Sequence, residues 1–195
     1  MSATLTRKET IYREAARLFR EKGYRASSMR DLAQRVGLEA SSLYNHIRSK
    51  EEILQDICFS NAEKFLQGMR VVELEGGSPP EQVEALIRLH IRIAIDAPTS
   101  ITVFNDEWRH LSEPHHSRFL SMRRDYEQRF LDILRKGIEN DFFRKVNPTT
   151  ALYTLLTSLR WMHYSYSEEK NGPEEEVARD VLQLLLGGLE KPVKQ

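Results

Sequence analysis

The chain has 195 residues, 40% of them hydrophobic, and its 29 Lys and Arg equal its 29 Asp and Glu. This composition predicts a folded globular protein and argues against a disordered one. The sequence also contains no apolar run close to the roughly 18 residues that cross a membrane, and no apolar signal core at its start. We therefore expect a cytoplasmic protein.

The charges are unevenly distributed along the chain. Residues 1–50 contain 11 Lys and Arg against 5 Asp and Glu, a surplus of six positive charges, and the remainder carries the opposite surplus because the whole chain is neutral. Nucleic-acid backbones are anionic, so a protein that binds them needs a basic surface only where contact is made. The distribution predicts an N-terminal part that binds nucleic acid, with chance clustering of solvated charges as the alternative.

The N-terminal part has the pattern of four helices. Apolar residues at helical spacing predict a first helix over residues 6–22. Ser28 and Asp31 form a capping-box pattern that opens a short second helix, and a third helix barely two turns long follows a glycine turn. A fuller capping box, Ser49 with Glu52, opens a long fourth helix that we expect to end near residue 72.

The rest of the chain again has a helical pattern after a loop over residues 73–80, which contains a glycine pair and a proline pair. The expected helices span residues 80–96, 100–111, 114–140, 148–167 and 174–189. No alternating strand pattern occurs anywhere. We therefore predict an all-α protein of about nine helices.

The second and third helices, with the glycine turn between them, predict a helix-turn-helix, whose third helix lies in the major groove of DNA. We expect Leu38, Leu43 and Ile47 to anchor this helix on the first two helices. Small and polar residues would then face outward: Glu39, Ala40, Ser41, Ser42, Tyr44, Asn45 and His46. Hydroxyl and amide groups suit phosphate oxygens and base edges. Lys50 adds a cation at a helix N-terminus, which itself favours phosphate.

Five segments carry a resemblance to a known family. They are Ala15-Ala-Arg-Leu-Phe19, Gly23-Tyr24, Ser28-Met-Arg-Asp-Leu-Ala33, Val36-Gly37 and Ser42-Leu-Tyr-Asn-His-Ile-Arg-Ser-Lys-Glu-Glu-Ile-Leu54. Over about residues 7–54 the chain resembles the DNA-binding domain of the TetR (tetracycline-repressor-like) family. Ile47 departs from that family, which usually has phenylalanine there, but it keeps an apolar anchor, and Asn45 occupies a variable position.

The resemblance implies a homodimeric regulator, usually a repressor, that binds a palindromic operator in double-stranded DNA and leaves it when a small ligand binds. It implies a helix-turn-helix head over residues 1–52, a ligand-binding and dimerisation domain over residues 53–195, and a homodimer through the last two helices. The DNA contacts that it implies are Ser28, Arg30, Ser41, Ser42, Tyr44, His46 and Lys50, to which the outward position adds Asn45.

Aromatic residues and arginines gather in the C-terminal part. Because small-molecule sites are mostly apolar with a few polar groups, we predict a ligand site here, although an ordinary core is the alternative. The candidate ligand-binding residues are Phe104, Trp108, Arg109, Phe119, Arg123, Tyr126, Trp161 and Tyr164. Arg123, Tyr126 and the segment 159–164 resemble the subgroup that senses acyl-CoA thioesters. Asp106 and Glu107 instead suit a cationic, drug-like ligand, as in regulators of drug efflux.

Nothing in the sequence predicts a catalytic site, a metal site or a resident cofactor. The sequence contains no nucleophile elbow, no phosphate-binding loop and no pair of catalytic carboxylates within a recognisable motif. His115 and His116 are adjacent and cannot easily face one ion from a helix, and Pro114 separates them from His110. An enzyme, or a ligand-binding dimer without DNA binding, is the competing class of function, and the basic head argues against both.

Overall fold

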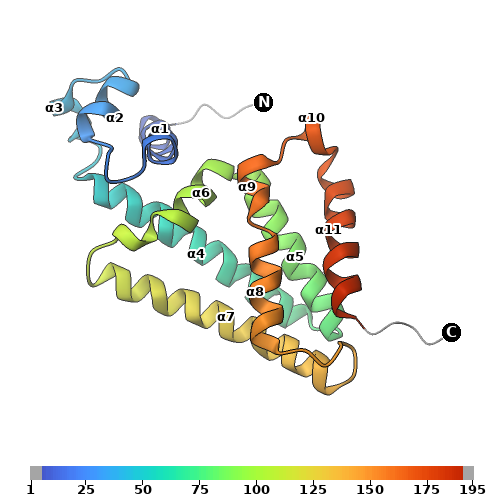
Figure 1. Cartoon of the computed structure of the whole chain (residues 1–195). Coiled ribbons are helices and arrows are strands. Elements are labelled where there is room, and N and C mark those ends of the chain that lie inside the picture. The colour runs from blue at the N-terminus through green and yellow to red at the C-terminus, as the bar shows by residue number, and fades with distance from the viewer. Residues whose placement is uncertain (1–5, 191–195) are drawn as a thin grey trace. The chain divides into compact units, whose positions relative to one another are not determined.

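The computed structural model describes residues 6–190 and confirms the all-α class (Figure 1). No strand occurs among these residues, and the one isolated antiparallel bridge joins Phe143 to Glu190. No helix within the described range is long and apolar enough to cross a membrane. The elements are α1 (Arg7–Lys22), α2 (Met29–Arg35), α3 (Ala40–Leu43), α4 (Lys50–Glu75), α5 (Pro79–Asp96), α6 (Pro98–Asp106), η1 (Trp108–His110), α7 (His115–Glu139), α8 (Pro148–Ser158), α9 (Trp161–Ser165), α10 (Glu168–Asn171) and α11 (Glu174–Leu189).

The described residues form two compact units. Unit 1 contains residues 6–62 and 99–120, and unit 2 contains residues 63–98 and 121–190. Helices α4 and α7 each contribute one part to unit 1 and the other part to unit 2. The domain boundary expected after residue 52 follows the helix-turn-helix motif alone, whereas unit 1 also includes α6 and η1.

Unit 1 begins with a well-capped α1. Thr6 accepts a hydrogen bond from the backbone of Glu9, whose carboxylate accepts from the backbone of Thr6, so two otherwise unpaired amides are satisfied. The helix ends at Gly23, which adopts φ 80° and donates its N–H to the carbonyl of Phe19. A side chain would strain that conformation, which explains the glycine. The buried face of α1 includes Ile11 and Phe19.

Unit 2 has its core around α5, against which both α9 and α11 pack. Val83, Leu86 and Ile87 are fully buried on α5. Gly137 on α7 allows a close approach, because a Cβ atom there would lie 2.2 Å from the ring of Phe143. This core is formed by amphipathic helices that bury one face each.

Three predicted helices have clearly different bounds in the structure. The helix expected over residues 100–111 is α6 followed by the separate 3-10 helix η1. Helix α4 continues to Glu75, because the helix-ending glycines come only after this residue. The helix expected over residues 148–167 is two helices, α8 and α9, which a tight turn joins. In this turn the backbone N–H of Arg160 donates to the carbonyl of Thr157. Leu159 and Arg160 keep right-handed helical dihedral angles, so the apolar periodicity continues through the break. The short α10 was not expected.

Candidate functional site

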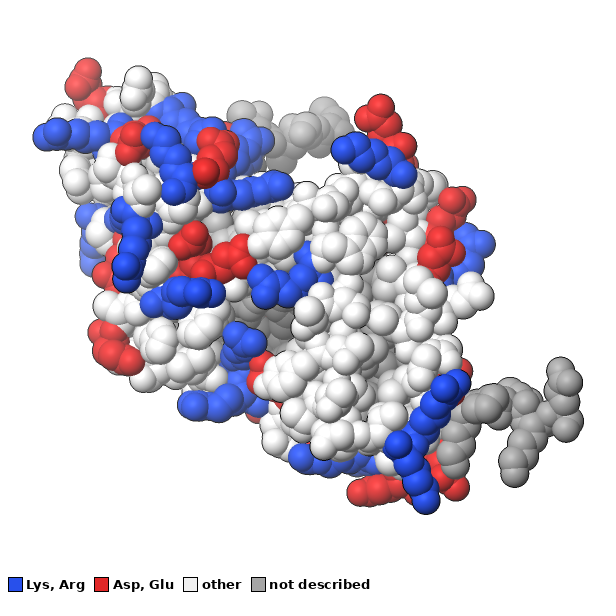
Figure 2. All heavy atoms as spheres, viewed as in Figure 1, with Lys and Arg blue, Asp and Glu red and all other residues white. Residues whose placement is uncertain are grey.

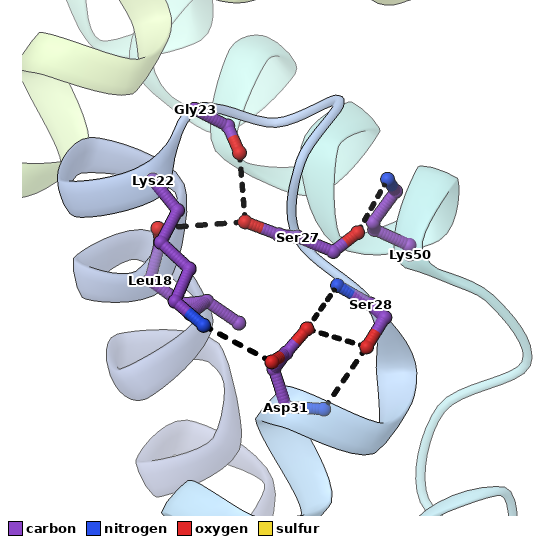
Figure 3. Close-up of polar contacts among 7 residues, drawn as sticks. All are labelled: Leu18, Lys22, Gly23, Ser27, Ser28, Asp31 and Lys50. Atoms are coloured by element: carbon purple, nitrogen blue, oxygen red, sulfur yellow. Dashed lines mark hydrogen bonds and ion pairs between the residues drawn. The ribbon is translucent and has the colours of Figure 1, made fainter.

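The start of α2 is fixed by the predicted capping box (Figure 3). The Ser28 hydroxyl accepts a hydrogen bond from the backbone N–H of Asp31 at 3.1 Å, and the Asp31 carboxylate accepts from both the backbone and the hydroxyl of Ser28. Lys22 donates to the same carboxylate at 3.0 Å. These hydrogen bonds, Ser28 first, lower the pKa of Asp31 to about 2. The Ser28 side chain, a predicted DNA contact, is therefore exposed but already bonded within the protein.

Lys50 lies at the first residue of α4, and its ammonium group faces the loop between α1 and α2 (Figure 3). Its Nζ atom donates to the backbone carbonyls of Tyr24 and Ser27, each at 2.8 Å, and lies 4.2 Å from the centroid of the Tyr24 ring. Burial lowers the pKa of Lys50. The lysine thus bonds α4 to the α1–α2 loop, an interaction that its place in the sequence did not reveal.

The segment from α3 to the start of α4 has the expected inward and outward faces. Leu43 and Ile47 are buried, whereas Tyr44 exposes 54% of its surface. Ser41, Asn45 and His46 are exposed as well, Ser42 is half-buried, and Arg30 on α2 is exposed. Five of the eight predicted DNA contacts therefore offer an exposed side chain without a described partner: Arg30, Ser41, Tyr44, Asn45 and His46.

The second capping box, predicted at Ser49 and Glu52, forms with one difference. The Ser49 hydroxyl accepts from the N–H of Glu52 at 3.1 Å, but the Glu52 carboxylate accepts from the backbone of Arg48 at 2.8 Å. The Arg48 side chain is exposed in the same segment as His46. Arg48 was not among the predicted contacts, although a cation within so polar a segment was a signal for it.

The candidate ligand residues of unit 1 form an aromatic cluster. Phe119 contacts Phe104 edge to face at 5.5 Å between ring centroids and stacks on Trp108 at 5.8 Å. Phe59 on α4 contacts Phe119 from another side at 6.5 Å. Arg109, in contrast, is exposed. The structure thus brings Phe104, Trp108 and Phe119 together.

The candidate ligand residues of unit 2 are not gathered in one place. Tyr126 is buried and hydrogen-bonded to His90, with 2.8 Å between its Oη and the imidazole Nε2. Arg123 is exposed and donates to Glu127 at 2.8 Å. Trp161 and Tyr164 are both exposed. His90 was missed, because a histidine on an amphipathic helix gives no sign of a partner 36 residues away.

Two histidines of unit 1, His110 and His116, have partners other than a metal ion. His110 lies 3.3 Å from the Glu107 carboxylate and stacks on Tyr24, and His116 lies 3.4 Å from Glu113. Over the described residues, no group of three or more His, Cys, Asp and Glu could hold a metal ion.

Comparisons with known proteins match both parts of the chain. A sequence model described as "Bacterial regulatory proteins, tetR family" matches residues 11–57, and one described as "Tetracyclin repressor-like, C-terminal domain" matches residues 76–189. The transcriptional repressor KstR2 of Mycobacterium tuberculosis (strain ATCC 25618 / H37Rv) is 25% identical over 189 residues, covering 95% of this chain and 94% of that protein. The solved structure of KstR2 from Mycobacterium tuberculosis superposes with a TM-score of 0.88, at 24% identity, over 97% of both chains.

Two further solved structures have the same fold. PfmR, a TetR family transcriptional regulator from Thermus thermophilus, superposes with a TM-score of 0.79 and is 33% identical, over 97% of this chain and all of that one. AibR, solved in complex with isovaleryl coenzyme A and operator DNA, has a TM-score of 0.79 at 21% identity, over 93% of this chain and 98% of that one. The helix-turn-helix geometry, the matched family models and the relation to PfmR lead to one conclusion: this chain belongs to the TetR family of bacterial transcriptional regulators.

Proposed function

We propose that this protein is a ligand-responsive repressor that binds a palindromic operator as a homodimer and leaves it when a small apolar ligand binds. The observation that carries the proposal is the segment from α3 to α4. Buried Leu43 and Ile47 fix it on the head, while Ser41, Tyr44, Asn45 and His46 remain exposed. Such a helix can enter a major groove and place hydroxyl, amide and imidazole groups against bases and phosphates.

The homodimer is proposed to form through α8 and α11, both in unit 2. Several apolar residues of these helices, including Leu152, Leu155 and Val181, are buried within the chain itself. Leu184, however, exposes 76% of its surface, and Tyr153 is exposed on α8. Figure 2 shows a broad surface without charged side chains over α8 and α9. An uncharged surface with exposed apolar residues is typical of a subunit interface.

A ligand would act through α4, the helix shared by both units. Its first turn holds the α1–α2 loop through Lys50, and its later part contributes Phe65 to the core of unit 2. In unit 1, Asn61 on α4 also donates to Ser100 on α6 at 2.7 Å. A ligand that displaces α4 would thereby change the separation of the two α3 helices, which must match half-sites about 34 Å apart.

The effector is proposed to be an apolar compound, with an acyl-CoA as the first candidate. The AibR complex with isovaleryl coenzyme A supports this class, because that protein shares the fold. A cationic aromatic compound is the second candidate. Glu107, one of the two carboxylates that suggested it, is half-buried in unit 1 beside His110.

The test is a fluorescence-anisotropy titration of the purified protein against DNA from its own promoter region, with shuffled DNA of equal composition as the control. The proposal predicts saturable binding to the promoter DNA alone, and release by isovaleryl-CoA, benzoyl-CoA or a long-chain acyl-CoA. Release by tetraphenylphosphonium instead would favour the cationic class. Equal affinity for promoter and shuffled DNA would contradict the repressor proposal, and turnover of the added compound would favour an enzyme.

A further inference from the structure

Unit 2 contains a hydrogen-bonded polar pair, formed by the half-buried His90 and the buried Tyr126. His90 on α5 and Tyr126 on α7 share the hydrogen bond of 2.8 Å between Nε2 and Oη. Phe65 from α4 covers both rings, with its centroid 4.6 Å from that of His90 and 5.8 Å from that of Tyr126. Phe130 contacts Tyr126 edge to face at 6.3 Å. The pair is therefore enclosed by aromatic rings from two further positions, on α4 and α7.

Both members of the pair are neutral at physiological pH. Burial lowers the pKa of His90 to about 4, so the imidazole carries no charge. Burial also raises the pKa of Tyr126, so the phenol keeps its proton. Arg129, the cation that acts on Tyr126 electrostatically, is bound by Glu73 and by Asp125. The pair thus offers hydrogen bonds to a ligand but no charge.

A count of hydrogens shows what the pair can bind. A neutral imidazole has one N–H and a phenol has one O–H, which makes two donors for the one bond between them. If Tyr126 donates to Nε2, the N–H is on Nδ1 of His90 and is left over. If Nε2 donates, the Tyr126 hydroxyl hydrogen is left over. In this second tautomer Nδ1 of His90 is an unpaired acceptor. In either tautomer one donor remains, and no described residue accepts from it.

The spare hydrogen lies on Nδ1 of His90 when Tyr126 donates to Nε2. This Nδ1 atom has no hydrogen-bond partner among the described residues. The His90 side chain is half-buried by surface area, and burial lowers the pKa of its imidazole. A group that is both desolvated and accessible is suited to a ligand that fills a mostly apolar site.

We propose that the His90–Tyr126 pair binds the carbonyl oxygen of an otherwise apolar effector. This inference rests on the proposed function, because it names the chemistry that the effector-binding part of a repressor recognises. The spare hydrogen needs an acceptor, which a ketone, ester or thioester carbonyl supplies. With the hydrogen on Nδ1, a cationic group would face a donor. Arg129, the cation that acts on Tyr126, already pairs with Glu73 and Asp125, which weakens its attraction for an anion. A neutral acceptor is the remaining partner.

The test uses two probes of nearly equal shape, cyclohexanone and methylenecyclohexane, of which only the first has an acceptor oxygen. Binding is followed by nitrogen-15 NMR of the imidazole of His90 in the full-length protein. We expect the ketone to shift this resonance and to bind about tenfold more tightly than the alkene, the discrimination of one hydrogen bond in a site of low polarity. No shift of His90 with the ketone, or equal affinities, would overturn the inference.

A paired variant removes both donors and keeps both rings. In the double variant His90→Phe with Tyr126→Phe, the two probes should bind within about twofold of each other, because replacing both partners of a hydrogen bond by apolar groups of similar shape leaves packing intact. Tyr166→Phe, which removes a hydroxyl elsewhere in unit 2, is the control and should keep the tenfold preference. Preference that survives in the double variant would overturn the inference. If the double variant does not fold, the shift of His90 in the unaltered protein decides.

A third comparison separates the carbonyl sources and the two proposals. Benzoyl-CoA is compared with S-benzyl-CoA, which lacks the thioester oxygen, and operator binding is measured on the same samples. If the protein prefers benzoyl-CoA over S-benzyl-CoA and the double variant loses this preference, the bound carbonyl is that of a thioester. If the only preference is for cyclohexanone over methylenecyclohexane, the bound carbonyl is that of a ketone. Operator binding without carbonyl preference refutes this inference alone. Carbonyl preference without operator binding refutes the repressor proposal alone.

Discussion

Lys50 shows how a residue can carry a different role from the one that its sequence position implies. Its ammonium group is held by the carbonyls of Tyr24 and Ser27, so it stabilises the junction of the α1–α2 loop with α4. A lysine that only contacted phosphate would be free of such bonds in the absence of DNA. The two roles predict different consequences of its removal.

We expect Lys50→Met to lower the free energy of unfolding by about 1–2 kcal/mol, because two charge-assisted hydrogen bonds are lost while the aliphatic stem is kept. Thermal unfolding followed by circular dichroism measures this change. Lys64→Met, which alters an exposed lysine of the same helix, is the control and should leave the melting temperature unchanged. If Lys50→Met weakened operator binding without any change in melting temperature, a phosphate contact alone would explain the residue.

Tyr44 is the complementary case, because its side chain exposes 54% of its surface and forms no hydrogen bond with a described residue. Tyr44→Phe should weaken operator binding about threefold to tenfold through the loss of one hydrogen bond to phosphate. The melting temperature and the dimer should not change. Anisotropy titration measures the affinity, and an unaltered dissociation constant would remove Tyr44 from the DNA contacts.

Asp31 gives unit 1 an acid-sensitive contact. Its pKa is lowered to about 2 in the folded protein, so the folded state favours the ionised carboxylate. This stability is fully present above the ordinary pKa of 3.8 and is lost as the pH falls through about 2. We expect Asp31→Asn to reduce the acid dependence of unfolding in that window. Chemical denaturation at a series of pH values tests this, and parallel pH profiles of variant and parent would contradict it.

At the scale of an element, α11 has two faces with separate uses. Val177, Val181 and Leu182 are buried against the chain, and α11 packs on α5. Leu184 is exposed instead. Gly187 and Gly188 lie one turn later, and a Cβ atom at either position would meet nothing within 4 Å. An exposed leucine beside open glycines allows another helix to approach closely.

We expect Leu184→Glu to dissociate the proposed homodimer and to abolish high-affinity operator binding, because two carboxylates would be buried at a symmetric interface. Sedimentation velocity measures the subunit state. Gln183→Glu, which adds the same charge at the neighbouring exposed position, is the control. A dimer that persists in Leu184→Glu would show that α11 does not form the interface through this face.

At the scale of the whole molecule, the charge distribution separates the head from the remainder. The surplus of positive charge within residues 1–50 coincides with the helix-turn-helix, where Figure 2 shows Lys and Arg interspersed with Asp and Glu. Several of these cations already have acidic partners, as Arg35 has in Glu14 and Glu21. The charge available for phosphate is therefore smaller than the sequence count suggests.

Operator affinity should nevertheless fall steeply with salt, because each phosphate contact releases a counterion. Between about 50 mM and about 200 mM salt we expect a decrease of at least about 100-fold for a dimer with several phosphate contacts in each head. Anisotropy titrations over a series of salt concentrations give the slope. A flat dependence would contradict binding through a basic head.

The sequence by itself determined the features that depend on neighbouring residues. Helical class, the ends of α1 and α11, and the Ser28–Asp31 capping box follow from apolar periodicity and from contacts within four residues. Only the tertiary structure decided where Lys50 points, that His90 meets Tyr126, and that Trp161 and Tyr164 are exposed. Those outcomes depend on packing between residues far apart in the chain, and one helical pattern is compatible with many such arrangements.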